Sequence, residues 1–372
     1  MIRYPILDVC TRIEGHELQH KILRENCRDF DDWQGLLTQS ELEGMTPLLK
    51  KHLEESQSIY PASVRRSLHV LAKHHQHQAN VRSTVLLEIL NIFQREHLTP
   101  VLIKGAALAH TTYPDSALRP MRDMDILLSK NEVDGAQELL RNVGFAQSKS
   151  PIPADHYHLP SLLKTVADVT VCIELHRGLY PQCPPYYPKL EFNRLLATAR
   201  KFEIADTEVL TLDNEETLNY LYQHAFRPPL TYESYKLINA ADIISFTERY
   251  YKILDWARIE RDFPLLYRAL PLMHHISPWD FSKIPIGFVS SKNRNKKLST
   301  APYAGWPHKR LKELKASGKT RSEILFNTFW PPSWWVQMYY GANSRIKKLW
   351  CLLTRHPRNI LWWVKLYSSL KK

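Results

Sequence analysis

Apolar residues recur at helical spacing through the first hundred positions of the chain, most clearly at Val81, Val85, Ile89, Ile92 and Phe93. The pattern stops at Thr99-Pro100, because proline cannot continue a helix and also restricts the residue before it. We therefore expect a helical cap over residues 1–98.

The pattern changes to short apolar runs from residue 99. Residues 100–104 form an apolar run of strand length, and residues 171–175 alternate Val, Ile and Leu with Cys172 and Glu174. Between them, one apolar helix face is predicted at Val133, Ala136, Leu140 and Val143. Strand, helix and strand in this order predict an α/β core with a mixed sheet over residues 99–210.

Helical periodicity returns after Asp213. Acidic residues follow Asn214 at a predicted helix start, and one side of that helix carries Leu218, Leu221, Tyr222 and Ala225. We expect a second helical domain over residues 211–290 and a separate basic, aromatic region over residues 291–372. The predicted fold class is α+β, a small mixed-sheet core flanked by N-terminal and C-terminal helical domains.

Three carboxylates are predicted to gather on one face of the sheet. Asp123 and Asp125 alternate with apolar residues, so on a strand they point to the same side. Glu174 projects from the polar face of the other predicted strand. Crowded carboxylates repel one another unless a cation lies between them, and hard oxygen ligands suit Mg²⁺. We therefore predict that Asp123, Asp125 and Glu174 hold a divalent metal.

Cationic residues lie close to these acids in the sequence. Lys104 precedes Gly105, where a turn into an Ala-rich helix lets backbone N–H groups approach a phosphate. Arg119 and Arg122 come just before the acidic pair, and phosphates are the natural counter-charge for these side chains. His176 shares the strand face of Glu174 and is a further candidate contact to a bound nucleotide.

Each of these residues also has a structural interpretation. An exposed strand or turn often carries two solvated aspartates, and Glu174 alone fits a surface glutamate. His176 is as well suited to a structural position, and Lys104 to a salt bridge with a neighbouring carboxylate. The combination of the Lys-Gly turn with the paired acids favours the functional interpretation.

The motifs LIKGAALA, RPMRDMDILL and IELH together resemble the bacterial nucleotidyltransferases of the DNA polymerase beta-like superfamily, in particular an uncharacterised, polysaccharide-associated group. The similarity extends from GMTPLLKKHL to LYQHAF and NAADII, over about residues 30 to 245. The usual Gly-Gly or Gly-Ser turn is replaced here by Gly105-Ala106. The resemblance implies a nucleotidyltransferase core that binds an NTP.

The implied activity is metal-dependent transfer of an NMP group from an NTP to a hydroxyl or phosphate acceptor, with Mg²⁺ or Mn²⁺. Asp123, Asp125 and Glu174 would be the catalytic metal ligands, and Lys104, Gly105, Arg119, Arg122 and His176 would bind the nucleotide. The association of the group implies a sugar phosphate or cell-envelope precursor as acceptor. Two alternatives remain: a transferase that modifies a protein or RNA, and a non-catalytic module anchored at the membrane surface.

Composition agrees with a folded cytoplasmic protein. The chain has 372 residues, of which 44% are hydrophobic, enough for two or three domains with cores. The cysteines are odd in number and scattered, which favours free thiols: Cys10, Cys27, Cys172, Cys183 and Cys351. The N-terminus has no signal-peptide core, and no apolar run approaches the roughly 18 residues needed to cross a bilayer.

Charge is concentrated at the C-terminal end. Residues 292–372 contain 18 Lys and Arg against two acids, or +16, and the remaining 32 and 36 leave −4 for residues 1–291. Tryptophans and tyrosines alternate with these cations in residues 330–372, which suits an anionic membrane surface at the inner membrane face. Nucleic acid is a less favoured partner, since the tryptophans cluster with Leu, Ile and Val. The structural alternative is a helical domain with an aromatic core and solvated lysines.

Overall fold

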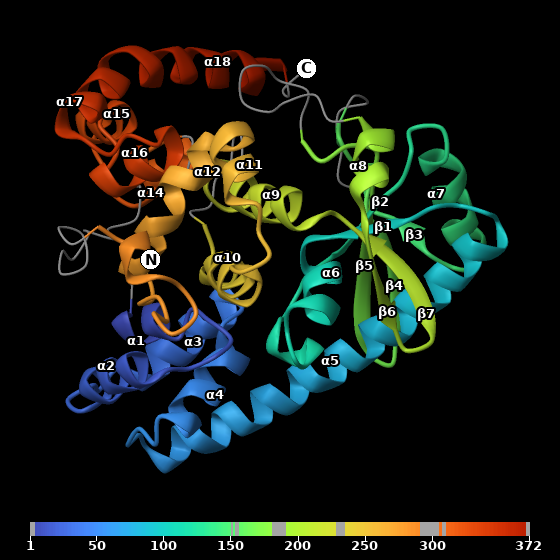
Figure 1. The fold of residues 1–372 in the computed structure, drawn as a ribbon, viewed down its shortest axis with the longest axis horizontal. Helices are drawn as coiled ribbons and strands as arrows, with labels where there is room; N and C mark the ends of the chain where they lie inside the picture. Colours follow the sequence, from blue (N-terminus) through green and yellow to red (C-terminus); the bar gives the residue numbers. More distant parts are fainter. Residues whose placement is uncertain are drawn as a thin grey trace. The chain divides into compact units, whose positions relative to one another are not determined.

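A computed structural model describes residues 4–149, 152, 156–180, 191–227, 235–290, 305–306 and 310–369 (Figure 1). Cys183 and residues 291–304, 307–309 and 370–372 of the predicted basic region lie outside the described residues. The chain divides into two compact units. The sheet unit comprises Ile13–Gly15 and Leu23–Tyr220, and the helical unit comprises Met1–Arg12, His16–Ile22 and Leu221–Lys372. The division into four domains predicted from sequence stays a prediction.

One mixed sheet of seven strands lies in the sheet unit, in the order β3-β4-β5-β2-β1-β7-β6. The β2–β5 and β1–β7 pairs are parallel, and the remaining pairs are antiparallel. The strands are β1 (Val101–Ile103), β2 (Met124–Leu127), β3 (Ala146–Gln147), β4 (Leu162–Val166), β5 (Val169–His176), β6 (Arg200–Ile204) and β7 (Thr207–Thr211). The predicted α+β class with a mixed sheet is therefore confirmed.

The sheet unit also contains helices, and those at Ala62–Arg95, Lys104–Thr111 and Val133–Asn142 share a buried core with the strands. The helical elements of this unit are α3 (Trp33–Glu43), α4 (Thr46–Glu55), α5 (Ala62–Arg95), α6 (Lys104–Thr111), the 3-10 turn η1 (Ser116–Leu118), α7 (Val133–Asn142) and α8 (Phe192–Thr198). The long helix α5 contains the predicted apolar stripe and crosses the strands diagonally in Figure 1. The predicted face of α7 is buried at Val133, Ala136 and Leu140, whereas Val143 follows the helix and is exposed.

The alternation of side chains separates a core face from a polar face in the two central strands. Met124 and Ile126 of β2 join Ile173 and Leu175 of β5 in one buried cluster with α5 and α7. In the parallel register, Asp125 is the partner of Glu174. Because side chains alternate along a strand, both acids lie on the face opposite to this core.

The helical unit is built almost entirely of helices. Its elements, with α2 and α9 extending past the unit boundary, are α1 (Pro5–Val9), α2 (Glu17–Cys27), α9 (Asn214–Phe226), α10 (Leu237–Tyr250), α11 (Trp256–Asp262), α12 (Pro264–Ala269), η2 (Leu270–His275), η3 (Ile286–Phe288), α14 (Leu311–Ala316), α15 (Arg321–Phe329), α16 (Ser333–Tyr340), α17 (Arg345–Trp350), the π-helical turn η4 (Cys351–Arg355) and α18 (His356–Ser369). The predicted stripe of α9 is buried throughout. The side chain of Asp213 accepts a hydrogen bond from the backbone N–H of Glu216 at 2.8 Å, which caps the start of α9.

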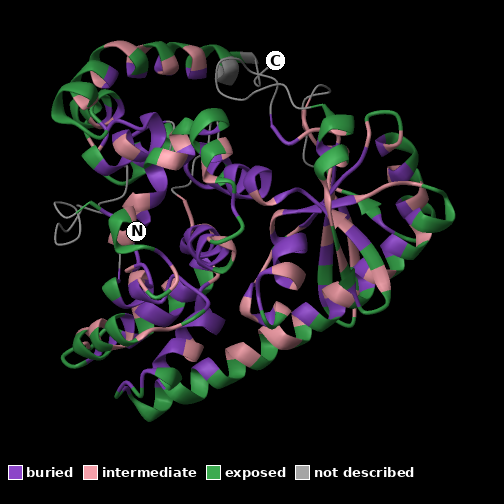
Figure 2. Cartoon of the chain, viewed as in Figure 1, coloured by how far each residue is buried: buried purple, intermediate pink, exposed green. Residues whose placement is uncertain are grey.

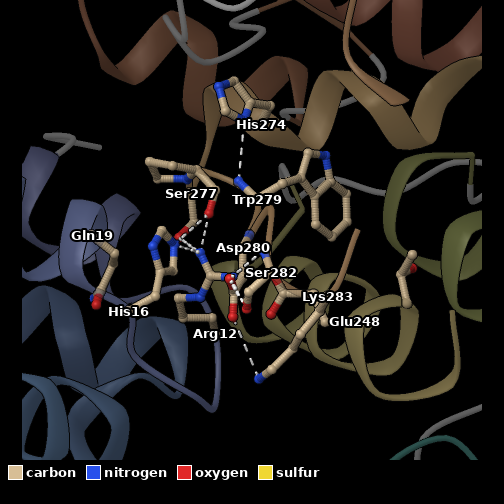
Figure 3. A network of polar contacts seen from close by, with 12 residues as sticks. Arg12, His16, Gln19, Glu248, His274, Ser277, Trp279, Asp280, Ser282 and Lys283 are labelled. Atoms are coloured by element: carbon tan, nitrogen blue, oxygen red, sulfur yellow. Dashed lines mark hydrogen bonds and ion pairs between the residues drawn. The ribbon is translucent and has the colours of Figure 1, made fainter. Parts of the chain in front are cut away.

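A buried ion pair links the N-terminal segment to residues far away in the sequence (Figure 3). The guanidinium of Arg12 pairs with the carboxylate of Glu248 on α10, and both side chains are almost completely buried. Arg12 also donates to the carbonyl of Pro278, and the backbone N–H of Asp280 donates to Glu248 at 2.9 Å. These contacts hold residues 277–280 against α10. Removing any one partner would leave a buried charge or polar group unpaired, which is costly.

Most of the C-terminal aromatic side chains form a core. Trp334, Trp335, Tyr339, Tyr340 and Trp363 are buried, and the rings of Trp335 and Tyr339 are stacked at 4.5 Å. These five side chains are therefore not available to a membrane or nucleic acid. Trp330 and Trp350, in contrast, are about half exposed, at 48% and 52%. No helix in the described part of the chain is long and apolar enough to cross a membrane.

Candidate active site

The end of β1 and the strands β2 and β5 bring the predicted acids and Lys104 together. Asp125 lies on β2 between two neighbours, with Ile103 of β1 as its partner on one side and Glu174 of β5 on the other. Lys104 follows Ile103 directly, and its ammonium donates to Asp125 Oδ1 at 2.8 Å. The predicted salt bridge of Lys104 is thus present in a cluster that also contains a second carboxylate.

Hydrogen bonds hold the carboxylates of Asp125 and Glu174 in place. His176 Nε2 lies 2.7 Å from the same Asp125 oxygen that Lys104 contacts. The hydroxyl of Ser161, just before β4, donates to Glu174 Oε1 at 3.0 Å, while Glu174 Oε2 lies 3.9 Å from His176 Nε2. Ligand atoms of Asp125, Glu174 and His176 all lie within 4.8 Å of one another, the spacing needed to hold a metal ion.

Asp123 lies directly before β2, outside this closest group, but its carboxyl is coupled to the group by charge. Burial and repulsion from Asp125 raise the pKa of Asp123 to about 6. Burial also acts to raise the pKa of Asp125, but the ammonium of Lys104 and the hydrogen bond from His176 outweigh it, so this pKa is far below its usual range. The carboxyls of Asp123, Asp125 and Glu174 are therefore close enough to influence the charge of one another.

The turn between β1 and α6 is tightly constrained. Lys104 has a φ of 50°, in the left-handed region that non-glycine residues rarely adopt. Gly105 lies against the side chain of Arg119, since a Cβ at this position would come within 2.2 Å of Arg119 Nη1. Arg119 is buried, whereas Arg122 is exposed. The absence of a side chain at residue 105 therefore makes room for a guanidinium next to the start of α6.

A family model described as an uncharacterised nucleotidyltransferase matches residues 29–266. The chain belongs to this nucleotidyltransferase family. The matched region contains the whole sheet and every predicted site residue, and it supports nucleotidyl transfer as the general function. Searches of curated proteins and of solved structures found no match.

This nucleotidyltransferase has a small hollow beside the same turn. Its polar lining includes Arg82 and Ser83 of α5, His110 of α6, and Arg119. None of the three acids lines it, but Arg82 interacts electrostatically with Asp123. The hollow therefore borders the acidic cluster through two arginines and presents groups suited to an anion.

Sequence reasoning missed Ser161, Tyr157, Tyr220 and Arg82 in the nucleotidyltransferase. Tyr220 lies on α9, with its ring centroid 5.8 Å from the ammonium of Lys104, and burial raises its pKa far above the usual range. Burial also raises the pKa of Tyr157. Ser161 lies directly before β4, and only the pairing of β4 with β5 brings it to Glu174. No local pattern in the sequence indicated the partner of Arg82 or of either tyrosine.

Proposed function

We propose that this nucleotidyltransferase transfers an NMP group from an NTP to a hydroxyl or phosphate acceptor. The observation that carries the proposal is the parallel pairing of β2 with β5, which sets Asp125 opposite Glu174. Carboxylates from two neighbouring strands, with Asp123 directly before β2, thus lie close together. The same face carries Lys104, the first residue of α6.

Asp123, Asp125 and Glu174 would hold Mg²⁺ or Mn²⁺. Their chemistry fits such an ion, because all three offer hard oxygen ligands and because burial, together with repulsion from Asp125, raises the pKa of Asp123. When bound, the ion supplies positive charge to the triphosphate and to the oxygen that departs with pyrophosphate. His176 and Lys104 hold the Asp125 carboxylate at 2.7 and 2.8 Å, which fixes the direction in which its other oxygen points.

Lys104, Arg119 and Arg122 would clamp the phosphates. The Lys104 ammonium is already held in the site, and the Arg119 guanidinium packs on Gly105 at the start of α6. Backbone N–H groups at this helix start add further donors for phosphate oxygens. Arg122 is exposed, and its long side chain suits the outer part of a triphosphate.

The reaction would be an in-line displacement at the α-phosphorus. The acceptor oxygen forms a bond to this phosphorus, its proton passes to Glu174 when the acceptor is a hydroxyl, and the bond to the bridging oxygen breaks to release pyrophosphate. Glu174 is suited to this part because Ser161 binds one of its oxygens and leaves the other 3.9 Å from the nearest imidazole nitrogens. A sugar phosphate or cell-envelope precursor is the acceptor class that we favour from the motif resemblance.

The test is transfer of α-phosphate label from each of the four NTPs, with Mg²⁺ or Mn²⁺, to components of a cell extract. We expect the Asp123→Asn/Asp125→Asn variant to lose transfer by about a thousandfold or more, since metal-based charge stabilisation contributes several kcal/mol. Asp134→Asn is a matched control, because Asp134 is exposed in the first turn of α7. The mass of the labelled product would identify the acceptor.

Two outcomes would contradict the proposal. One is unchanged transfer by the Asp123→Asn/Asp125→Asn variant, which would remove these acids from the reaction. The other is the absence of transfer by the wild type with all four NTPs, together with no metal-dependent nucleotide binding. The second outcome would favour a module that keeps the fold without the chemistry.

A further inference from the structure

Large apolar side chains are unusually exposed in the C-terminal helices. Among the described residues, 18 large apolar side chains are exposed, and 11 of them lie between Leu311 and Val364. Single exposed apolar residues are normal on a soluble protein, whereas clusters mark a surface that contacts something apolar. The concentration in these helices therefore indicates a binding surface, and Figure 2 shows much of α18 as exposed.

The helical stretch formed by α17, η4 and α18 has two apolar sides. Its inner side is buried in the helical unit at Cys351, His356, Ile360 and Trp363. Six other apolar residues of the stretch are exposed: Ile346 (83%), Leu349 (49%), Trp350 (52%), Leu353 (63%), Leu361 (65%) and Val364 (48%). The first four of them recur at three- and four-residue spacing, as residues on one side of a helix do. Burial of the inner side explains why the stretch is folded, but it does not account for the exposed set.

These exposed side chains stand on a well-packed scaffold. His356, at the start of α18, lies 2.7 Å from the carbonyl of Thr328 on α15 and 2.9 Å from the hydroxyl of Tyr340 on α16. The helix α15 exposes three more apolar side chains, Leu325, Phe326 and Phe329, and Trp330 directly after the helix is also exposed. The exposed residues of α15, α17 and α18 therefore belong to one folded part of the helical unit.

The charge of this surface has one sign. From Ile324 to Ser369 the chain contains six Lys and Arg and no Asp or Glu. All six except Lys348 are classed as exposed, and the guanidinium of Arg355 lies 4.9 Å from the exposed ring of Trp350. Two copies meeting through this face would bring like charges together, which argues against a symmetric dimer.

The apolar side chains distinguish a membrane from a nucleic acid. Seven of the 11 exposed residues are aliphatic, and aliphatic side chains do not stack on bases. Aliphatic and tryptophan side chains interspersed with cations match the boundary between anionic headgroups and acyl chains. Since no described helix can cross a bilayer, the contact would be peripheral.

We propose that the exposed apolar and cationic side chains of α15, α17, η4 and α18 bind the surface of an anionic membrane. Leu, Ile and Trp side chains enter the headgroup region, while the neighbouring Lys and Arg side chains contact lipid phosphates. This inference rests on the helical unit alone and does not depend on nucleotidyl transfer.

The test is co-sedimentation of the full chain with vesicles of phosphatidylcholine, alone or mixed with phosphatidylglycerol. We expect binding that requires the anionic lipid and weakens as salt is added. Ile346→Ser/Leu349→Ser/Leu353→Ser should reduce the apparent affinity by about tenfold or more, because three apolar side chains no longer insert. Lys347→Gln/Arg358→Gln should reduce it by about 25-fold, at roughly fivefold for each cation near the surface.

Matched controls come from exposed residues elsewhere in the chain. Ile59→Ser/Val70→Ser removes two apolar side chains that are 89% and 66% exposed, and Lys73→Gln removes an exposed cation. These variants should bind vesicles as the wild type does. All of the substituted residues of the binding surface are exposed, so thermal unfolding should change little in every variant.

Two results would overturn the proposal. The first is equal sedimentation with both vesicle types, or unchanged binding by the triple serine variant. The second is tight binding of single-stranded RNA that the same substitutions abolish, without vesicle binding, which would assign this face to nucleic acid. Neither result bears on label transfer from NTPs, so failure here is distinguishable from failure of the proposed activity.

Discussion

The pair formed by Lys104 and Asp125 allows structural and catalytic roles to be separated. The two charged atoms lie 2.8 Å apart, and the side chains are 12% and 2% exposed. We consider Lys104→Met, Asp125→Asn and the double variant. Each single change leaves one buried charge without its main partner, whereas the double change removes both charges.

The expected energies follow from this burial. Breaking a buried pair by removing one partner typically costs about 3–5 kcal/mol of unfolding free energy. Lys104→Met should lie near the lower end, because His176 still contacts Asp125 at 2.7 Å. The double variant should be about as stable as one single variant, which corresponds to a coupling energy of about 3–5 kcal/mol, the cost of the other single change.

Urea unfolding of the four proteins measures this coupling, and transfer of α-phosphate label measures activity in the same set. A control cycle on Lys201 and Glu208 has the same 2.8 Å separation, but these side chains are 68% and 61% exposed. Exposed pairs contribute at most about 1 kcal/mol, so coupling in the control should be small. The double variant of Lys104 and Asp125 should be less destabilised than the sum of the two single variants. Its transfer activity should nevertheless stay lost.

Two results would refute this reasoning. The first is a coupling energy for Lys104 and Asp125 that is no larger than that of the exposed control pair. It would mean that burial does not set the strength of the ion pair. The second is recovery of label transfer in the double variant, which would mean that the Asp125 carboxylate is dispensable for the reaction.

Three further predictions concern a glycine, a buried acid and a histidine. Gly105→Ala should raise the KM for NTP, because the new Cβ displaces the Arg119 guanidinium, whereas Gly135→Ala, with open space around it, should leave KM unchanged in steady-state assays. Glu248→Gln removes the partner of a fully buried guanidinium and should lower the unfolding free energy by about 3 kcal/mol or more in urea unfolding; a change below about 1 kcal/mol would contradict this. Burial lowers the pKa of His356 from 6.5 to about 4, so its neutral form stabilises the fold above pH 6.5 and this contribution is lost as pH falls toward 4. Urea unfolding across this pH range should therefore show a steeper decline for the wild type than for His356→Asn, and equal slopes would exclude the histidine as the cause.

Local pattern was sufficient to predict the elements that carry the site. The apolar stripe of α5, the end of that helix before Pro100 and the face of β2 that carries Asp125 all follow from spacing along the chain. The reason is that periodicity reports which side of an element is buried, and this depends on residues only a few positions apart. Gly105 was likewise predicted to adjoin a cation, although not to contact Arg119 itself.

Tertiary structure decided which elements became neighbours. The parallel pairing of β5 with β2 sets Glu174 opposite Asp125, and the antiparallel β4 brings Ser161 to the same carboxylate. It also made His176, rather than Asp123, the third member of the closest group of ligand atoms. Strand order is set by packing between segments tens of residues apart, which local spacing does not encode.

The C-terminal region illustrates the same division. The sequence by itself determined that aromatic residues and cations are mixed there, without acids after Glu323. Only the folded chain decided that Trp335 and Trp363 are core while Trp350 is exposed. Identical residue types have different exposure because burial depends on which face of each helix meets the rest of the helical unit.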